Sequence, residues 1–193
     1  MAEILLFHHV QGLTPGFVAF ADELRAAGHT VRTPDLFDRR TFPTLEEGMA
    51  YAKTVGFGTI LDRGVAEAEA LEADIVYVGI SMGVMLAQKL AQTRTGARGA
   101  VFVDACFPVT EFGDDRWPDG VPVQVHGMDA DPMFTDGGDL DAARDLVQSA
   151  EHAELFLYPG NVHLFADSSL PSYDQAATEL TIGRVLDFLS RLG

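Results

Sequence analysis

The stretch VYVGISMGVMLAQ (residues 76–88) sets a serine between two glycines, after an apolar run and before a run of helix-forming residues. Apolar side chains at nearly every position before the turn indicate a strand that is buried on both faces. The segment Gly79-Ile80-Ser81-Met82-Gly83 fits G-x-S-x-G, the pattern of a sharp strand-to-helix turn that exposes a serine. Larger residues two positions before or after that serine would clash with the neighbouring strand or helix. The stretch therefore predicts that Ser81 is a nucleophile at the carboxyl end of a strand.

Short apolar runs of this kind recur along the chain and alternate with helical patterns. Phe17, Phe20, Ala21 and Leu24 have the spacing of a buried helix face, and Thr44 with Glu47 forms a capping box. The strand-like segments are residues 3–9, 29–35, 73–80, 99–105, 121–127 and 153–160. Further helices are expected near residues 45–55, 60–72, 83–95, 140–150 (capped by Asp139) and 173–190.

Repeated strand–helix alternation predicts an α/β fold with a doubly wound, mainly parallel sheet of about six strands flanked by helices. Together with the G-x-S-x-G turn, this fold indicates a compact α/β-hydrolase. We find no internal repeat and no dividing linker, so residues 1–193 are expected to form a single α/β-hydrolase domain. This length leaves little room for a cap domain. The longest loop-like stretch is residues 107–120, which either covers part of the site or only connects two elements.

Composition narrows the partners and the compartment. The net charge is −16, which argues against nucleic acid or an anionic membrane as a partner, because both are polyanions. Cys106 is the one cysteine, so an internal disulfide is excluded and a reducing compartment is compatible. The N-terminal segment lacks the basic region of a signal peptide, and the longest apolar run is too short to span a bilayer. We expect a cytoplasmic protein that acts on a small molecule, while its oligomeric state stays open.

A serine hydroxyl needs a base to become a nucleophile, and the base needs an acid to orient it. In this fold the chain order is serine, acid, histidine, and His163 follows the last predicted strand. The preceding strand ends in HGMDADPMF, which offers Asp129 and Asp131. The turn that Asp131 forms with the following proline favours Asp131, and Asp104, one strand earlier, is the third candidate.

Two backbone N–H groups are expected to form an oxyanion hole. One belongs to Met82, directly after the serine, and the other comes from the loop after the first strand, where Val10 is the candidate and His9 the alternative. His8 and His9 would point to opposite faces of an extended strand, which makes them a poor metal chelate. We therefore expect no metal ion at these histidines.

With these residues placed, the chain resembles the dienelactone hydrolase family over nearly its whole length. The resemblance lies in FHHVQGLTPGFVAFADELRAAGHTVRTPDLF (residues 7–37), GISMGV (residues 79–84) and YPGNVHLFAD (residues 158–167). It implies hydrolysis of a small carboxylic ester or lactone through an acyl-enzyme, without a cofactor.

Three positions depart from that family. Ser81 stands where dienelactone hydrolases have cysteine, His9 where they have a glutamate that touches the nucleophile, and Asp167 where an arginine holds a substrate carboxylate. Exchange of that cation for an anion should disfavour a lactone that carries a carboxylate. On this basis His9 and Asp167 are candidates for the substrate pocket. Further candidate lining residues are Phe165, Phe107 and Trp117.

Two other functions remain open for this sequence. One is a non-catalytic binding protein on an α/β-hydrolase scaffold, and the other is an acyltransferase that uses the same three residues. A dinucleotide-binding protein is disfavoured because HHVQGLTPG (residues 8–16), after the first strand, lacks G-x-G-x-x-G.

Overall fold

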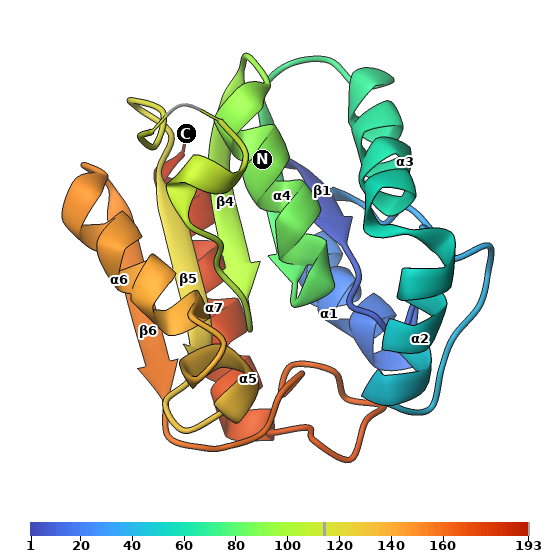
Figure 1. The fold of residues 1–193 in the computed structure, drawn as a ribbon. Coiled ribbons are helices and arrows are strands. Elements are labelled where there is room, and N and C mark those ends of the chain that lie inside the picture. The colour runs from blue at the N-terminus through green and yellow to red at the C-terminus, as the bar shows by residue number, and fades with distance from the viewer. Residues whose placement is uncertain (114, 193) are drawn as a thin grey trace.

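Six parallel strands form one sheet in the part of the chain that the structure describes, in the order β2-β1-β3-β4-β5-β6 (Figure 1). The structure is a computed structural model and describes residues 1–113 and 115–192. The predicted doubly wound α/β architecture is thus confirmed. The strands are β1 (Glu3–Phe7), β2 (Thr30–Arg32), β3 (Ile75–Ile80), β4 (Ala97–Val103), β5 (Val123–Met128) and β6 (Ala153–Tyr158).

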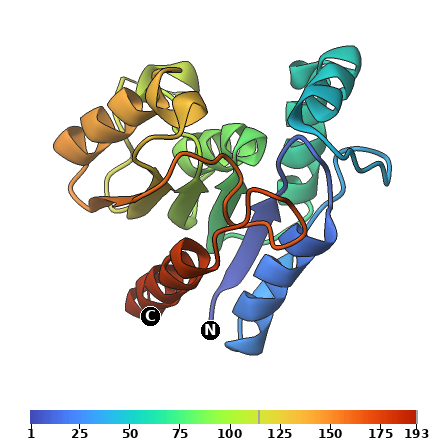
Figure 2. The same cartoon turned by 90° about the horizontal axis from the view of Figure 1, so that it is seen from below.

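Helices cover both faces of the sheet. Viewed along the strands, α1 and α7 lie on one face, and the other helices lie on the opposite face (Figure 2). No described helix combines the length and the apolar composition required to cross a bilayer. The helices are α1 (Pro15–Ala26), α2 (Leu45–Val55), α3 (Phe57–Glu69), α4 (Met82–Thr93), α5 (Pro132–Thr135), α6 (Asp139–Ser149) and α7 (Gln175–Arg191).

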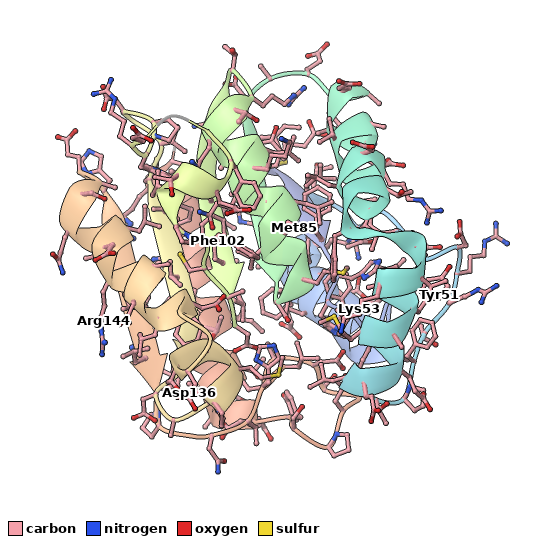
Figure 3. The ribbon with its side chains drawn as sticks, viewed as in Figure 1. Tyr51, Lys53, Met85, Phe102, Asp136 and Arg144 are labelled. Atoms are coloured by element: carbon pink, nitrogen blue, oxygen red, sulfur yellow. The ribbon has the colours of Figure 1, made fainter. Side chains whose placement is uncertain are left out.

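The central strands are apolar throughout because their side chains alternate between two buried cores. In β3, Ile75 and Tyr77 pack beneath α3 and α4, whereas Val76, Val78 and Ile80 pack against α1 and α7. The strand is fully buried along its length. Figure 3 labels Phe102 on β4 and Met85 on α4, and it shows the side chains of Asp136 and Arg144 near the outside of the molecule.

The strand order reverses direction between β1 and β3, and this reversal indicates where a ligand-binding site is expected. Chain segments leave β1 toward β2 on one side and continue from β3 toward β4 on the other. In open α/β sheets, ligands bind beyond the carboxyl ends of the strands at this switch point. The loops after Phe7 and after Ile80 meet there, because these strands run in register from Glu3 opposite Ile75 to Phe7 opposite Gly79.

Helix α4 approaches the sheet so closely that its contacts admit only glycine at two positions. A Cβ on Gly83 would overlap the carbonyl oxygen of Phe7, at the end of β1. A Cβ on Gly79 would overlap the backbone of Gly83 and Val84. The predicted reason for both glycines is therefore confirmed, and the first turn of α4 lies directly against β1 and β3.

Two expectations about local structure need correction or completion. The sequence predicts Asp139 as the cap of α6, but the N-cap is Gly138, at φ +96°. The prediction was wrong because the carboxylate of Asp139 instead accepts the backbone N–H of Cys106 at 2.9 Å. The loop-like stretch 107–120 contains a 3-10 turn at Val109–Glu111, and its residue 114 lies outside the described part.

We predict opposite effects for two glycine-to-alanine substitutions within helices. Gly83→Ala should lower the free energy of unfolding by about 1–3 kcal/mol, because the new methyl group displaces β1 from α4. Gly183→Ala, on α7 with no atom within 4 Å of the new Cβ, should raise it by about 0.5–1 kcal/mol. Urea unfolding of both variants measures the difference. Equal effects of the two substitutions would contradict the close approach of α4.

Candidate active site

Ser81 lies at the turn between β3 and α4 in a conformation that few residues adopt. Its φ of +51° and ψ of −115° lie outside the regions favoured by non-glycine residues, and its N–H donates to the carbonyl of Val103 at 2.7 Å. The side chain is 9 % exposed, so it is reached from a cavity rather than from an open surface. Helix α4 begins at the next residue, so the positive end of its dipole lies beside Ser81.

His163 reaches the serine from the other end of the chain. It lies in the loop between β6 and α7, which crosses beneath the carboxyl ends of the strands (Figure 1). Its Nε2 lies 2.8 Å from the Oγ of Ser81. The structure thus brings together the two residues that the sequence selected as nucleophile and base, although 82 positions separate them.

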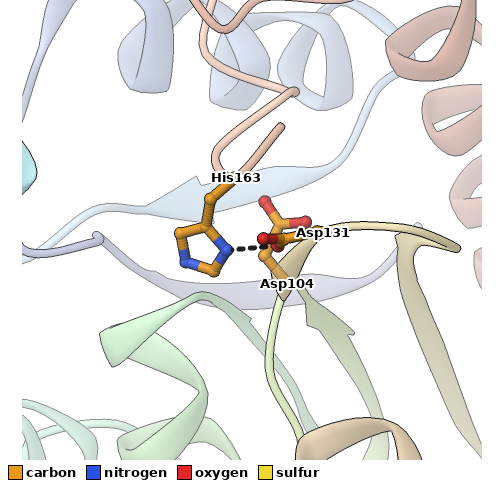
Figure 4. A group of neighbouring side chains, drawn as sticks. All are labelled: Asp104, Asp131 and His163. Atoms are coloured by element: carbon orange, nitrogen blue, oxygen red, sulfur yellow. Dashed lines mark hydrogen bonds and ion pairs between the residues drawn. The ribbon is translucent and has the colours of Figure 1, made fainter. Parts of the chain in front are cut away.

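Asp131 is the acidic residue that bonds to His163 on the side away from Ser81. Its Oδ2 lies 2.6 Å from the Nδ1 of His163 (Figure 4), and its Oδ1 accepts the N–H of Met133 at 2.9 Å, which caps the short helix α5. One oxygen therefore faces the imidazole while the other fixes the carboxylate to the backbone. Asp129, the alternative acid, is exposed, and its carboxylate accepts the N–H of Gly160.

The charges around His163 favour its protonated form. Burial by itself lowers the pKa of the imidazole, but the hydrogen bond to Asp131 and the carboxylates of Asp104, Asp131 and Asp139 raise it by more. The net result is a pKa above the ordinary value of 6.5. A ring with these neighbours is suited to take a proton from Ser81 and to hold the resulting charge.

Two backbone N–H groups beside the serine remain available. Met82 and Val10 both line the cavity at Ser81, and neither N–H donates to another group among the described residues. The N–H of Met82 is the first of helix α4 and has no intrahelical partner. The arrangement is compatible with the predicted oxyanion hole.

Three non-glycine residues around the site have strained backbone conformations. Ser81, Asp104 and Leu164 all have positive φ, at +51°, +62° and +60°. Such conformations cost about 1–3 kcal/mol each and persist only where surrounding contacts impose them. The contacts here are hydrogen bonds between neighbouring strand ends and the histidine loop, since Leu164 donates its N–H to Asp104 at 2.9 Å.

A cavity of about 380 Å³ opens beside Ser81 and His163. Most of its wall is apolar, and two carboxylates are its charged groups besides the histidine. A larger hollow of about 450 Å³ lies between α1 and α7 and has neither Ser81 nor His163 in its lining. The residues around the first cavity are Val10, Met49, Phe57, Ser81, Met82, Met85, Asp104, Ala105, Phe107, Met133, Asp139 and His163.

Several sequence-based candidates for the pocket lie elsewhere. Phe107 lines the cavity as suggested, but His9, Asp167 and Phe165 do not, and each is at most 1 % exposed. Trp117 is buried against Phe102 and its indole N–H donates to Val121. The sequence analysis missed three methionines and Phe57, because apolar residues on helices do not reveal which of them face a cavity. The three methionines are Met49 on α2, Met85 on α4 and Met133 on α5.

His9 and Asp167 bond to each other, so two departures from the resembled family form one contact. The Nε2 of His9 lies 2.8 Å from Oδ2 of Asp167, and Thr14 and Ser169 also donate to this carboxylate. Burial raises the pKa of Asp167, but these hydrogen bonds outweigh burial and lower it to about 2. The pair joins the loop after β1, which carries Val10, to the loop of His163.

The histidines after β1 use their ring nitrogens within the protein. His8 donates its Nδ1–H to the carbonyl of His9 and accepts the N–H of Leu36 at Nε2, and burial lowers its pKa to about 4. His9 accepts the N–H of Gln11 at Nδ1. Both rings thus serve to hold loops in place.

Asp104, Asp131 and His163 each offer one ligand atom within 4.8 Å of the others, a set that suits a cation by residue type. However, Nδ1 of His163 and Oδ2 of Asp131 already form a 2.6 Å hydrogen bond. A cation would have to displace the proton between them. The contacts therefore favour an acid–base pair over a metal centre.

The buried cysteine is not an alternative nucleophile to Ser81. Cys106 is 1 % exposed, and burial raises the pKa of its thiol well above the ordinary value. A thiol in this environment is a poor nucleophile because the thiolate is the reactive form.

The fold and this cluster define the class of the protein, an α/β-hydrolase with a serine, histidine and aspartate at the strand ends. The sequence model of the dienelactone hydrolase family matches residues 2–193. The chain therefore belongs to the dienelactone hydrolase family. None of the curated proteins matches the sequence.

Solved structures share the fold at low sequence identity. The protein called m3DLH superposes with a TM-score of 0.78 at 16% identity, over 99% of this chain and 86% of that chain. For a dienelactone hydrolase-like promiscuous phosphotriesterase from metagenomic libraries, the TM-score is 0.71 at 18% identity, over 100% of this chain and 87% of that chain. For esterase 2 of Thermogutta terrifontis, phosphonylated by cyclosarin, the TM-score is 0.73 at 16% identity, over 100% of this chain and 83% of that chain.

The buried carboxylate of Asp167 generates a prediction about stability. Asp167→Asn should lower the free energy of unfolding by about 2–3 kcal/mol near neutral pH, because a pKa of about 2 in the folded state lies about two units below the ordinary value. A lowered pKa stabilises the fold above about pH 4, and this contribution is lost as pH falls toward 2. Thermal unfolding across this range measures it.

The exposed residue Asp62 on α3 provides the control, and Asp62→Asn should unfold like the wild type at every pH. A constant difference between wild type and Asp167→Asn down to pH 2 would contradict the assigned role of the carboxylate.

Proposed function

We propose that this chain is a serine hydrolase that cleaves small, uncharged carboxylic esters or lactones through an acyl-enzyme. The proposal rests on one observation above all, the two hydrogen bonds of 2.8 Å and 2.6 Å that connect Ser81, His163 and Asp131 in this order. Membership of a hydrolase family and the likeness to esterases support the same reaction class.

In the first half of the reaction, His163 takes the proton of Ser81 at Nε2 while the serine oxygen attacks the carbonyl carbon. Asp131 keeps the other proton on Nδ1, so that Nε2 is free to accept. The N–H groups of Met82 and Val10 would stabilise the negative charge on the carbonyl oxygen. His163 then donates its proton to the leaving alcohol, and the acyl group remains on the serine.

In the second half, a water molecule replaces the alcohol. His163 takes a proton from this water, whose oxygen attacks the acyl carbon, and returns that proton to the serine oxygen as the ester bond breaks. The free acid leaves and Ser81 regains its hydroxyl. An alcohol in place of water would give acyl transfer instead, so the products identify which acceptor the enzyme uses.

The cavity wall supports a neutral and apolar substrate. Four methionines and two phenylalanines line it, and its charged side chains besides His163 are the carboxylates of Asp104 and Asp139. Among the residues that the structure describes, neither lysine nor arginine contributes to the lining. Apart from His163, the cavity wall offers an anionic substrate no positive charge to compensate for the hydration that it loses. A volume of about 380 Å³ suits a small ester or lactone.

Two of the similar structures suggest a chemical probe. The Thermogutta terrifontis esterase is phosphonylated by sarin and by cyclosarin. An activated serine in this chain should react with a fluorophosphonate in the same manner, whereas an ordinary surface serine would not.

We predict that Ser81→Ala abolishes turnover of p-nitrophenyl acetate, with a loss on the order of 10⁴-fold or more, because no oxygen remains to carry the acyl group. Fluorophosphonate labelling should disappear in the same variant. Ser190→Ala, at an exposed position of α7, is the control and should leave both readouts unchanged. A Ser81→Ala protein that is folded and nearly as active as wild type would refute the proposal.

The raised pKa of His163 predicts how the reaction depends on pH. The imidazole acts as a base only when neutral, so kcat/KM should rise with pH. The midpoint of this rise should lie above 6.5, because the net effect of Asp131, Asp104 and Asp139 raises the pKa of the ring. A profile measured between about pH 5 and pH 9 tests this. A midpoint clearly below 6.5 would mean that a different group is the base.

A further inference from the structure

Asp104 is a buried carboxyl group that the proposed reaction does not use. It directly follows β4, is 1 % exposed, and donates its backbone N–H to the carbonyl of His126 at 2.8 Å. Its Oδ2 accepts the N–H of Leu164 at 2.9 Å, and Oδ1 has no hydrogen-bond partner among the described residues. A buried polar atom without a partner is costly and calls for a reason.

The surroundings of Asp104 indicate why a carboxyl group is buried at this position. The carboxyl group lies beside the His163–Asp131 pair, with one atom of each side chain within 4.8 Å of the others (Figure 4), and Asp104 also lines the cavity at Ser81. Leu164, which it binds, is the residue directly after His163. Asp104 therefore contacts the backbone of the histidine loop and also places a carboxyl group close to the imidazole.

We infer that Asp104 is a positioning residue for His163, which fixes the histidine loop through the N–H of Leu164 and stabilises the imidazolium with its own negative charge. The inference rests on the proposed function, because the imidazolium is formed when His163 accepts the proton of Ser81. No proton passes to Asp104 in this step. The O–H bond of the serine breaks, an N–H bond forms at Nε2, and Nδ1 keeps its proton toward Asp131.

The charges that face His163 come from three elements. Asp131 follows β5, Asp104 follows β4, and Asp139 begins α6, while Ser81 is the uncharged partner at β3. Burial raises the pKa of Asp104 to about 7, with a contribution from the negative charge of Asp131 that the neighbouring His163 opposes.

Asp104 and His163 are therefore coupled. The imidazolium favours ionised Asp104, and ionised Asp104 favours the imidazolium. Above about pH 7 the carboxylate is charged, and it supports the proton transfer that begins the reaction. This role differs from that of Asp131, which holds the Nδ1 proton directly.

Two substitutions separate the functions of this carboxyl group. In Asp104→Asn the amide oxygen can still accept the N–H of Leu164, but the negative charge is absent. In Asp104→Ala both the charge and the acceptor are removed. Asp129→Asn is the matched control, because Asp129 also follows a strand and accepts a backbone N–H, from Gly160, but does not contact His163.

The first readout is the pH profile of kcat/KM for p-nitrophenyl acetate. Asp104→Asn should shift the acidic limb to lower pH by about one unit, because an opposite charge near the imidazolium is lost. It should also reduce kcat about tenfold with little change in KM, since one pKa unit corresponds to a factor of ten. Asp104→Ala should show the same shift and a further loss of kcat, and Asp129→Asn should match the wild type.

A second readout keeps this inference separate from the proposed function. The pKa of His163 is followed by NMR in wild type and Asp104→Asn, with His163→Asn used to assign the signal. A pKa lower by about one unit in Asp104→Asn supports the inference even if no tested ester is turned over. Absence of Ser81-dependent turnover refutes the proposed function alone. An unchanged pKa and an unchanged acidic limb in folded Asp104→Asn would refute the role of Asp104.

Discussion

The close approach of helix α4 to strands β1 and β3 is the constraint on which the site depends. Gly83 lies against the carbonyl of Phe7, and Gly79 lies against the first turn of the helix. Next to this contact the backbone at Ser81 has a positive φ, and the N–H of Met82, as the first of the helix, has no intrahelical partner. Nucleophile, candidate oxyanion donor and helix dipole are thus placed by one backbone arrangement, which side chains larger than hydrogen at two positions would prevent.

The histidine loop depends on a different set of contacts. It has no regular secondary structure between β6 and α7, and buried carboxylates hold it at two places. Asp104 accepts the N–H of Leu164 from the end of β4, and Asp167 bonds to His9 in the loop after β1. A loop carrying a base must be held firmly, because a hydrogen bond of 2.8 Å to the serine tolerates little displacement. In this protein, acidic residues supply both stability and electrostatic support for the imidazole.

Much of the fold followed from local patterns, since an apolar run buried on both faces and a helix with one apolar stripe leave periodic signals. The six strands and the helices near residues 45–55 and 140–150 were predicted in this way. The candidate nucleophile, base and preferred acid also lie together as expected, because parallel strands end at one edge. Their chemical roles stay predictions. The pocket assignment failed for Asp167 and Phe165, whose burial depends on residues far away in the chain.

The sequence by itself determined the order of strands and helices, the sharp turn at Ser81 and membership of a hydrolase family. These properties depend on residues close together in the chain or on short patterns of residue types. Tertiary structure alone decided that Asp139 turns from its helix toward Cys106, and that Met49 and Phe57 line the cavity. Each of these depends on the direction of a side chain relative to a distant element, and no local periodicity encodes such a direction.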